Sequence, residues 1–224
     1  MAFGNGPSIV TNGLVLALDA GDRNSYVSGS TVWRDLSGNN NNGTLTNGPG
    51  FDTGSISAIS FDGVDDFVTM NSSTSLTTST PTLIVTCTTN NGIVLAKGGN
   101  GSYWNYGLLS LTSTSFRARN NNNDTLSPTF TASTSTYNVY AIVWTGSTMQ
   151  FYRNGVYGGD NAASYSPSAQ NSLFLRIGCA WNNNTSQNVE FYSGKIASIQ
   201  IYNRALSATE ILQNYNATKT RFRL

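Results

Sequence analysis

The sequence predicts an all-β fold in which two antiparallel sheets pack face to face, with one short helix near the C-terminus. Short runs with an apolar residue at every second position recur along the chain and are separated by clusters of Gly, Asn, Ser and Thr. Only one segment places its apolar residues at helical spacing. The length of 224 residues suits a single large all-β domain.

The alternating runs define the expected strands. They span residues 14–19, 31–34, 43–46, 56–61, 66–70, 82–89, 92–97, 105–112, 115–119, 138–145, 148–153, 172–179, 189–193 and 195–202. The Asn-Gly pair at Asn154 and Gly155 predicts a tight hairpin, because both residues tolerate the positive φ of a type I′ turn. A second turn is expected over Asp62–Asp66. Trp33 and Trp144 lie within strand patterns and are expected in the core.

The expected helix covers residues 207–216. It opens with the Ser-x-x-Glu pattern of Ser207 and Glu210, which predicts a capping box. The alternation over residues 219–224 predicts a final tail strand. We therefore expect one domain over residues 13–224, preceded by an N-terminal arm over residues 1–12.

Composition excludes several function classes. The chain has no His, which removes Ser-His and Cys-His nucleophiles and His-ligated zinc. A net charge of +1 without a basic run argues against nucleic-acid binding. No apolar run approaches the ~18 residues that span a bilayer, and the first residues lack the pattern of a secretory signal. A Lys-poor composition, together with the absence of a recognisable leader, favours a virion protein. Such a protein is made in the host cytoplasm and is extracellular after lysis.

The two cysteines, Cys87 and Cys179, occupy inward positions of two predicted strands. We expect two buried thiols that act as small apolar side chains. A disulfide stays open at this point, because spacing alone does not decide it.

The order of several segments resembles a known family. These segments are Gly13–Ala20, Trp33–Asn39, Asn42–Leu45, Ile59–Val68, Phe151–Gly155 and Gly194–Ile211. Together they resemble the laminin-G-like, concanavalin A-like jelly-roll domains, and more narrowly the structural proteins of tailed marine and cyanobacterial phages. The resemblance implies a jelly-roll sandwich with a short C-terminal helix. It leaves the activity open, because this fold carries lectins, adhesion domains, glycosidases and structural proteins.

The sequence predicts no enzyme. Glycosidases need two carboxylates that flank the scissile bond. Glu190 stands alone and Glu210 is explained as a helix cap. Asp65 and Asp66 are adjacent at a strand start, so we expect their side chains on opposite faces, where they cannot act as an acid–base pair.

Calcium is the one cofactor that the resemblance suggests. Its candidate ligands are oxygen-bearing side chains near two turns: Asp35, Asn39, Asp62, Asp65 and Asp66. The same residues also suit Asx turns that need no metal. We favour turn chemistry and keep calcium as the alternative.

Two loops combine aromatic residues with Gly and Asn, as glycan-binding rims do. The candidate glycan-binding residues are Tyr103, Trp104, Tyr106, Trp181, Asn182 and Asn183. Aromatic rings stack on the apolar faces of sugars, and amides bind their hydroxyls. The alternative is that Trp104 and Trp181 fold back as lids on the core.

The chain ends are the candidate particle-docking segments. The docking residues are Phe3, Ile9 and Val10 in the arm and Arg221, Phe222 and Leu224 in the tail. We expect a virion surface protein, on the head, a fibre or the tail, that oligomerises on the particle, contacts other virion proteins and binds host-surface glycans. The alternatives are a purely structural shell protein and a bacterial carbohydrate-binding module.

Overall fold

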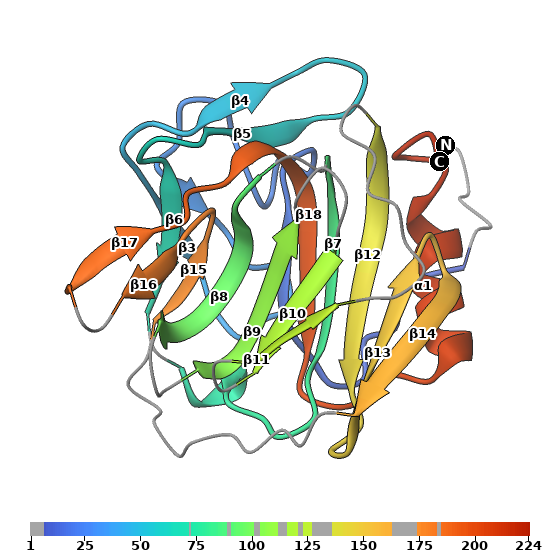
Figure 1. The fold of residues 1–224 in the computed structure, drawn as a ribbon. Helices are drawn as coiled ribbons and strands as arrows, with labels where there is room; N and C mark the ends of the chain where they lie inside the picture. Colours follow the sequence, from blue (N-terminus) through green and yellow to red (C-terminus); the bar gives the residue numbers. More distant parts are fainter. Residues whose placement is uncertain are drawn as a thin grey trace.

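The computed structural model describes residues 7–71, 73–88, 91–100, 104–111, 116–120, 123–126, 136–162, 174–182 and 185–224. Two antiparallel sheets dominate this part of the chain (Figure 1), which confirms the predicted fold class. The first sheet, sheet A, runs in the order β14 (Val156–Ala162), β13 (Thr148–Arg153), β12 (Tyr137–Trp144), β7 (Thr82–Thr88), β18 (Ser193–Tyr202), β5 (Ala58–Asp62) and β4 (Gly50–Asp52). Strand β1 (Leu14–Asp19) pairs with the second half of β18.

The second sheet, sheet B, carries the strands that matter for the candidate site. Its order is β11 (Asn123–Leu126), β10 (Phe116–Asn120), β9 (Trp104–Leu111), β8 (Ile93–Asn100), β15 (Leu175–Ile177), β6 (Phe67–Met70), β3 (Gly43–Thr46) and β2 (Val32–Trp33). At the end of β8, strand β16 (Ala180–Asn182) pairs in parallel with β8. Strand β17 (Gln187–Val189) pairs with β16 and forms a short hairpin at this edge.

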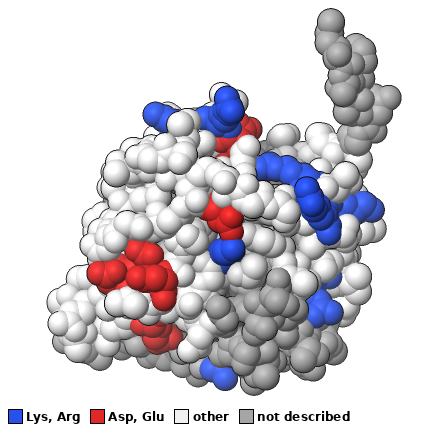
Figure 2. Space-filling model, turned by 90° about the horizontal axis from the view of Figure 1, so that it is seen from above, with Lys and Arg blue, Asp and Glu red and all other residues white. Residues whose placement is uncertain are grey.

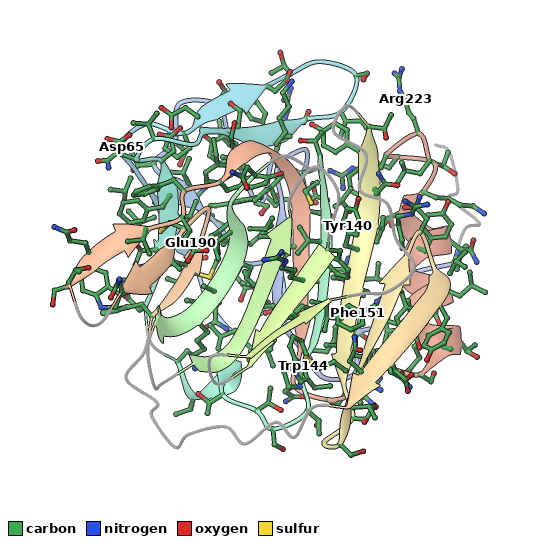
Figure 3. The ribbon with its side chains drawn as sticks, viewed as in Figure 1. Asp65, Tyr140, Trp144, Phe151, Glu190 and Arg223 are labelled. Atoms are coloured by element: carbon green, nitrogen blue, oxygen red, sulfur yellow. The ribbon has the colours of Figure 1, made fainter. Side chains whose placement is uncertain are left out.

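The core lies between the two sheets and follows the alternation of the strands. Leu83, Val85 and Cys87 on β7 are fully buried, as the period of two requires. Phe116 on β10 meets Tyr140 on β12 and Phe151 on β13, with ring centroids 5.1 and 5.4 Å apart (Figure 3). Burial of such side chains stabilises the fold by about 1.5–3 kcal/mol each.

Several local predictions about the core and its turns are confirmed. Trp33 and Trp144 are fully buried. Asn154 and Gly155 have φ values of 51° and 76° and close the β13–β14 hairpin. Their backbone geometry explains why this hairpin needs an Asn-Gly pair.

Both cysteines are free and buried, which confirms the expectation of two apolar-like thiols. Burial raises the pKa of Cys179 to about 12 and raises that of Cys87 as well. Neither thiol is therefore ionised near neutral pH, and neither has nucleophilic character.

Helix α1 (Ala208–Thr218) covers the outer face of sheet A, on the side of β12 and β13 (Figure 1). Ser207 caps its first turn, and the reciprocal Ser207–Glu210 capping box is present. Ile211 packs against outward residues of the sheet, including Val139 and Ala141. The predicted helix is thus confirmed. No described helix is long and apolar enough to cross a membrane.

The tail beyond α1 differs from the prediction. Residues 219–224 form turns instead of the expected strand, because backbone bonds such as Phe222 N to Thr218 O prolong the helical turn. Phe222 is buried against Ala58 and Ala197 on sheet A. The alternation of this tail therefore reflects one buried side chain and not a strand.

A buried lysine ties a 3₁₀ turn, η1 (Thr74–Leu76), to sheet B. Lys97 on β8 is fully buried, and its ammonium donates to the carbonyl of Leu76 and to the hydroxyl of Thr77. Burial lowers the pKa of Lys97 to about 8. Its position among the turn carbonyls gives it a structural role.

Candidate functional site

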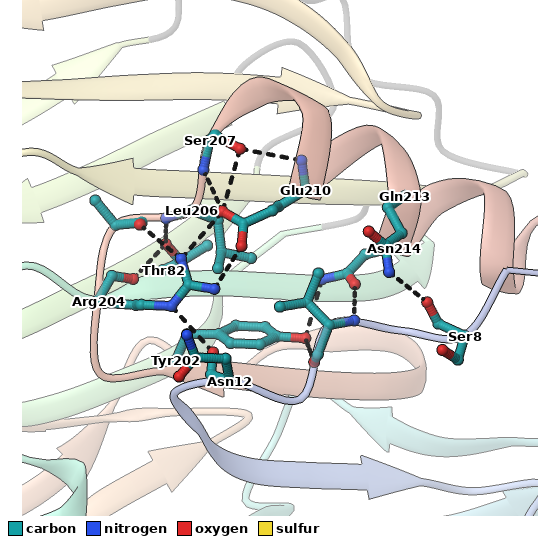
Figure 4. A network of polar contacts seen from close by, with 12 residues as sticks. Ser8, Asn12, Thr82, Tyr202, Arg204, Leu206, Ser207, Glu210, Gln213 and Asn214 are labelled. Carbon is teal, nitrogen blue, oxygen red and sulfur yellow. Dashed lines mark hydrogen bonds and ion pairs between the residues drawn. The ribbon is translucent and has the colours of Figure 1, made fainter.

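The predicted N-terminal docking residues lie against the chain's own helix. Val10 is buried, and its amide donates to Asn214 Oδ1 at 2.7 Å (Figure 4). Tyr202 Oη donates to the Val10 carbonyl at 2.9 Å and accepts from Asn214 Nδ2 at 3.0 Å. Ile9 is half-buried, and Phe3 lies outside the described residues. The Val10 side chain is therefore taken up inside this domain and is unavailable to a partner.

The C-terminal docking residues divide in the same way. Phe222 is buried and Leu224 is half-buried against the same face. Arg221 is exposed and forms an ion pair with Asp19. The buried Phe222 side chain contributes to the core of this domain and is not exposed for docking. Ile9, Arg221 and Leu224 retain exposed surface.

Three of the predicted calcium ligands converge. One carboxylate oxygen each of Asp62, Asp65 and Asp66 lies within 4.8 Å of the other two, and acidic side chains gather at the left of the face seen in Figure 2. The expectation that Asp65 and Asp66 point to opposite faces is corrected, because residues 63–65 form a bend and regular alternation starts only at β6.

The electrostatics of this acidic cluster, Asp62, Asp65 and Asp66, suit a hard cation. Burial raises the pKa of Asp66, and the charges of Asp62 and Asp65 raise it further. Two of the oxygens already serve the turn: Asp62 Oδ1 accepts from Val64 N at 2.8 Å, and Asp66 Oδ2 accepts from Asp62 N at 3.1 Å. The remaining carboxylate oxygens are ligands of the type that Ca²⁺ prefers.

The other two predicted ligands, Asp35 and Asn39, lie in a separate turn. Asp35 accepts from the amides of Ala17 and Ser37 at 2.9 Å and of Asn41 at 3.0 Å. Asn39 Nδ2 donates to Ser37 Oγ at 3.0 Å. These bonds account for Asp35 and Asn39 as turn-forming residues, apart from the acidic cluster.

Two of the predicted glycan residues, Trp104 and Trp181, have their backbones beside the end of β8. Gly98 of β8 pairs with Trp104 of β9 on one side, and Gly99 pairs with Trp181 of β16 on the other. The backbone of Tyr106 continues β9, and Asn182 follows Trp181 on β16. Tyr103 and Asn183 lie outside the described residues. The topology thus brings two distant loops of the sequence to one edge of sheet B.

Arg176 completes this edge and was missed by the sequence analysis. Its guanidinium carbon lies 4.6 Å from the centre of the Trp181 ring and 5.7 Å from that of Phe174. Leu175 and Ile177 point into the core, so Arg176 points outward from β15. Phe174 is 43% exposed. We call Phe174, Arg176, Trp181 and the neighbouring Asn188 the β15–β17 patch.

The polar atoms of this patch are only partly satisfied. Arg176 Nε and Asn188 Oδ1 are buried and have no hydrogen-bond partner. Asn188 pairs with Trp181 across the β16–β17 hairpin, so the two side chains share a face. Burial lowers the pKa of Arg176, although an arginine stays charged at any physiological pH. The patch offers a cation, an acceptor and exposed aromatic surface together.

A second hollow lies at another end of the sandwich. It has a volume of about 510 Å³, and its lining includes Arg23, Ser28, Thr53 and the ring pair of Tyr26 and Phe51, whose centroids are 5.0 Å apart. Tyr26 is buried and its hydroxyl donates to Ser30 O. The lining of this hollow is largely apolar, although it includes Arg23 and three Ser or Thr residues. The β15–β17 patch instead places a cation directly against aromatic rings, and we take it as the candidate for a polar ligand.

Solved structures share this fold over nearly the whole chain. A mutant sialidase of Trypanosoma rangeli with trans-sialidase activity matches with a TM-score of 0.71 at 16% identity, over 96% of this chain and 34% of that one. Domain 4 of AbnA, a GH43 extracellular arabinanase from Geobacillus stearothermophilus solved with arabinotriose, matches with a TM-score of 0.69 at 13% identity, over 94% and 100% of the two chains. This chain spans about a third of the sialidase's length.

A third similar structure is the binding domain of Paraclostridial Mosquitocidal Protein 1, with a TM-score of 0.66 at 18% identity over 92% of this chain and 52% of that one. These identities establish a shared fold alone.

No curated protein matches the sequence. The family described as the concanavalin A-like lectin/glucanases superfamily matches residues 62–212, more than half of the chain. The chain belongs to this superfamily.

Proposed function

We propose that this protein is a non-enzymatic glycan-binding domain that binds through the β15–β17 patch. The observation that carries the proposal is the placement of Arg176 beside Trp181, with Phe174 exposed next to them. Aromatic rings provide apolar surface for the faces of sugars, while charged and amide groups bind their hydroxyl and acidic groups. Two of the similar folds support this function: Domain 4 of AbnA, which was solved in complex with arabinotriose, and the binding domain of Paraclostridial Mosquitocidal Protein 1.

Two substitutions in the patch test the proposal. The purified protein is applied to a glycan array, and bound glycans are then titrated by calorimetry. We expect Trp181→Ala and Phe174→Ala each to weaken binding, because both remove aromatic surface at the patch. Val64→Ala provides the control, since Val64 is also exposed, at 69%, but lies in the acidic turn. Unchanged affinity in both patch variants would reject the patch as the binding site.

The proposed setting is the surface of a phage particle, where many copies offset a low affinity at each site. The resemblance of the ordered segments to phage structural proteins supports this setting. Cryo-electron microscopy of the particle would show the protein, its neighbours and its exposed face. A protein found on the particle that binds no glycan would favour the purely structural alternative, and one absent from any particle would favour a bacterial carbohydrate-binding module.

Calcium at the acidic cluster forms an accessory part of the proposal. Asp62, Asp65 and Asp66 would hold the ion, and its positive charge would offset the repulsion between the three carboxylates. We expect Ca²⁺ to raise the thermal midpoint of the wild type, because a ligand that binds only the folded state stabilises it. Asp65→Asn should reduce this rise, whereas Asp22→Asn, in a separate turn, should not. An equal rise in both variants would exclude the cluster as the calcium site.

A further inference from the structure

The charge of Arg176 is unusual within the part of the chain that the structure describes. Arg204 and Arg221 form ion pairs with Glu210 and Asp19. Arg23 and Arg223 are exposed to solvent. Arg176, by contrast, is partly buried, its Nε is fully shielded and has no hydrogen-bond partner, and it forms no ion pair with the residues that the structure describes. A partly buried cation without an anionic partner is costly to the folded state.

The aromatic neighbours explain how the charge is held in place. Trp181 and Phe174 lie 4.6 and 5.7 Å from the guanidinium carbon. Cation–π attraction to these rings restricts the side chain, while its Nε is left without an acceptor. One face of the Trp181 ring is therefore occupied by Arg176, and the indole acts as a support for the guanidinium.

We propose that the β15–β17 patch selects glycans that carry a carboxylate, such as uronic acids and sialic acids, and that Arg176 binds the carboxylate. This inference rests on the proposed function and specifies its ligand class. The planar guanidinium presents its donors as a fork that matches both oxygens of a carboxylate. Exposed Phe174 offers apolar surface beside the guanidinium.

The test compares ligands that differ only in the acidic group. The full chain is titrated with oligogalacturonate and with a sialylated oligosaccharide, each beside its carboxyl-reduced form, and with a sulfated oligosaccharide. We expect reduction of the carboxyl group to weaken binding about tenfold to a hundredfold, as loss of a charge-assisted hydrogen bond does. Arg176→Gln should cause a similar loss, and Arg176→Lys an intermediate one, because lysine keeps the charge without the fork.

The control is Arg223→Gln, which removes an exposed arginine near the C-terminus and should leave the affinity unchanged (Figure 3). Circular dichroism and thermal midpoints establish that each variant is folded. Three results would overturn this inference while leaving glycan binding intact. The carboxylated glycans could bind no better than their reduced forms, or no better than the sulfated glycan. Alternatively, folded Arg176→Gln and Arg176→Lys could both keep full affinity. Binding to none of the glycans would overturn the proposed function as well.

Discussion

The outer faces of the two sheets are used differently. The outer face of sheet A is covered by α1 and by the segment around Val10, which together form an apolar cluster with outward residues of β7, β12, β13 and β18. At the β15–β17 patch, the outer surface beside sheet B carries Arg176 and exposed Phe174. Side chains on the covered face serve stability, whereas the β15–β17 patch holds polar groups that lack partners. Substitutions on the two faces should therefore affect different measurements.

The largest effect on stability is expected from Ile211→Ala. Ile211 is 3% exposed and packs within the cluster under α1. Its truncation leaves a cavity and should lower the free energy of unfolding by about 2–5 kcal/mol. Chemical denaturation followed by circular dichroism measures the change. The neighbouring Leu212→Ala, at a position that is 45% exposed, is the control. Equal losses in the two variants would contradict the assignment of the buried helix face.

A smaller loss is expected from Asn214→Ala. Asn214 is buried and binds both the Val10 amide and the Tyr202 hydroxyl (Figure 4). Removing it leaves the buried Val10 amide without its acceptor, at a cost of about 1–3 kcal/mol. The Tyr202 hydroxyl keeps its bond to the Val10 carbonyl. Gln213→Ala should cost less than about 0.5 kcal/mol, because its bond to Ser8 is exposed. The same denaturation assay measures both changes in the free energy of unfolding. A loss for Asn214→Ala no greater than that for Gln213→Ala would show that the Asn214 hydrogen bonds do not contribute to stability.

The pH dependence of the helix start should be weaker still. Arg204, helped by the Ser207 amide and hydroxyl, lowers the pKa of Glu210 to about 2. Because the folded-state pKa lies below the usual 4.5, this contribution is complete above pH 4.5 and is lost as the pH falls toward 2. Glu210→Gln should therefore differ from the wild type by less than about 1 kcal/mol at pH 7, and the difference should vanish near pH 2. A difference that stays constant over this range would exclude the carboxylate as its source.

The smallest effect on stability, within about 0.5 kcal/mol, is expected from Phe174→Ser on sheet B. Phe174 is 43% exposed and lies outside the hydrophobic clusters formed by the described residues, so its loss leaves the core intact. The same variant should weaken glycan binding, which calorimetry measures. A variant that loses several kcal/mol of stability would show that the patch, like the covered face of sheet A, serves the fold.

The strands that were predicted share a feature: one face is buried in the central core. Strands β1, β3 and β13 have the predicted bounds. Each contributes apolar side chains to the central core, among them Leu16, Leu45 and Phe151. Strands β4, β11, β14 and β16 were missed. The first three lie at the ends of their sheets, where a strand has only one neighbour, and β16 has only three residues, too few for a clear alternation. The tail at residues 219–224 was misassigned, because a single buried Phe222 in a turn mimics the period of a strand.

The site was predictable only in part, for a similar reason. Trp181 was found because a large aromatic residue among Asn residues signals a rim. Arg176 carried a usable signal, namely a lone charge on the outward face of an apolar strand, but its meaning depends on the Trp181 ring brought to it by the β16 pairing. Asn188 carried none, since its unsatisfied oxygen is visible only once β17 is placed. Contacts between distant segments are set by topology, which local patterns do not contain.

The anchoring of both ends on sheet A gives the molecule a direction. Val10 and Phe222 each pack onto that sheet, so the polypeptide enters and leaves the domain on its covered side. Arg176 and Trp181 belong to strands of the other layer. A support, tag or neighbouring domain joined at either end would therefore attach on the covered side of sheet A. The β15–β17 patch would then face the solvent.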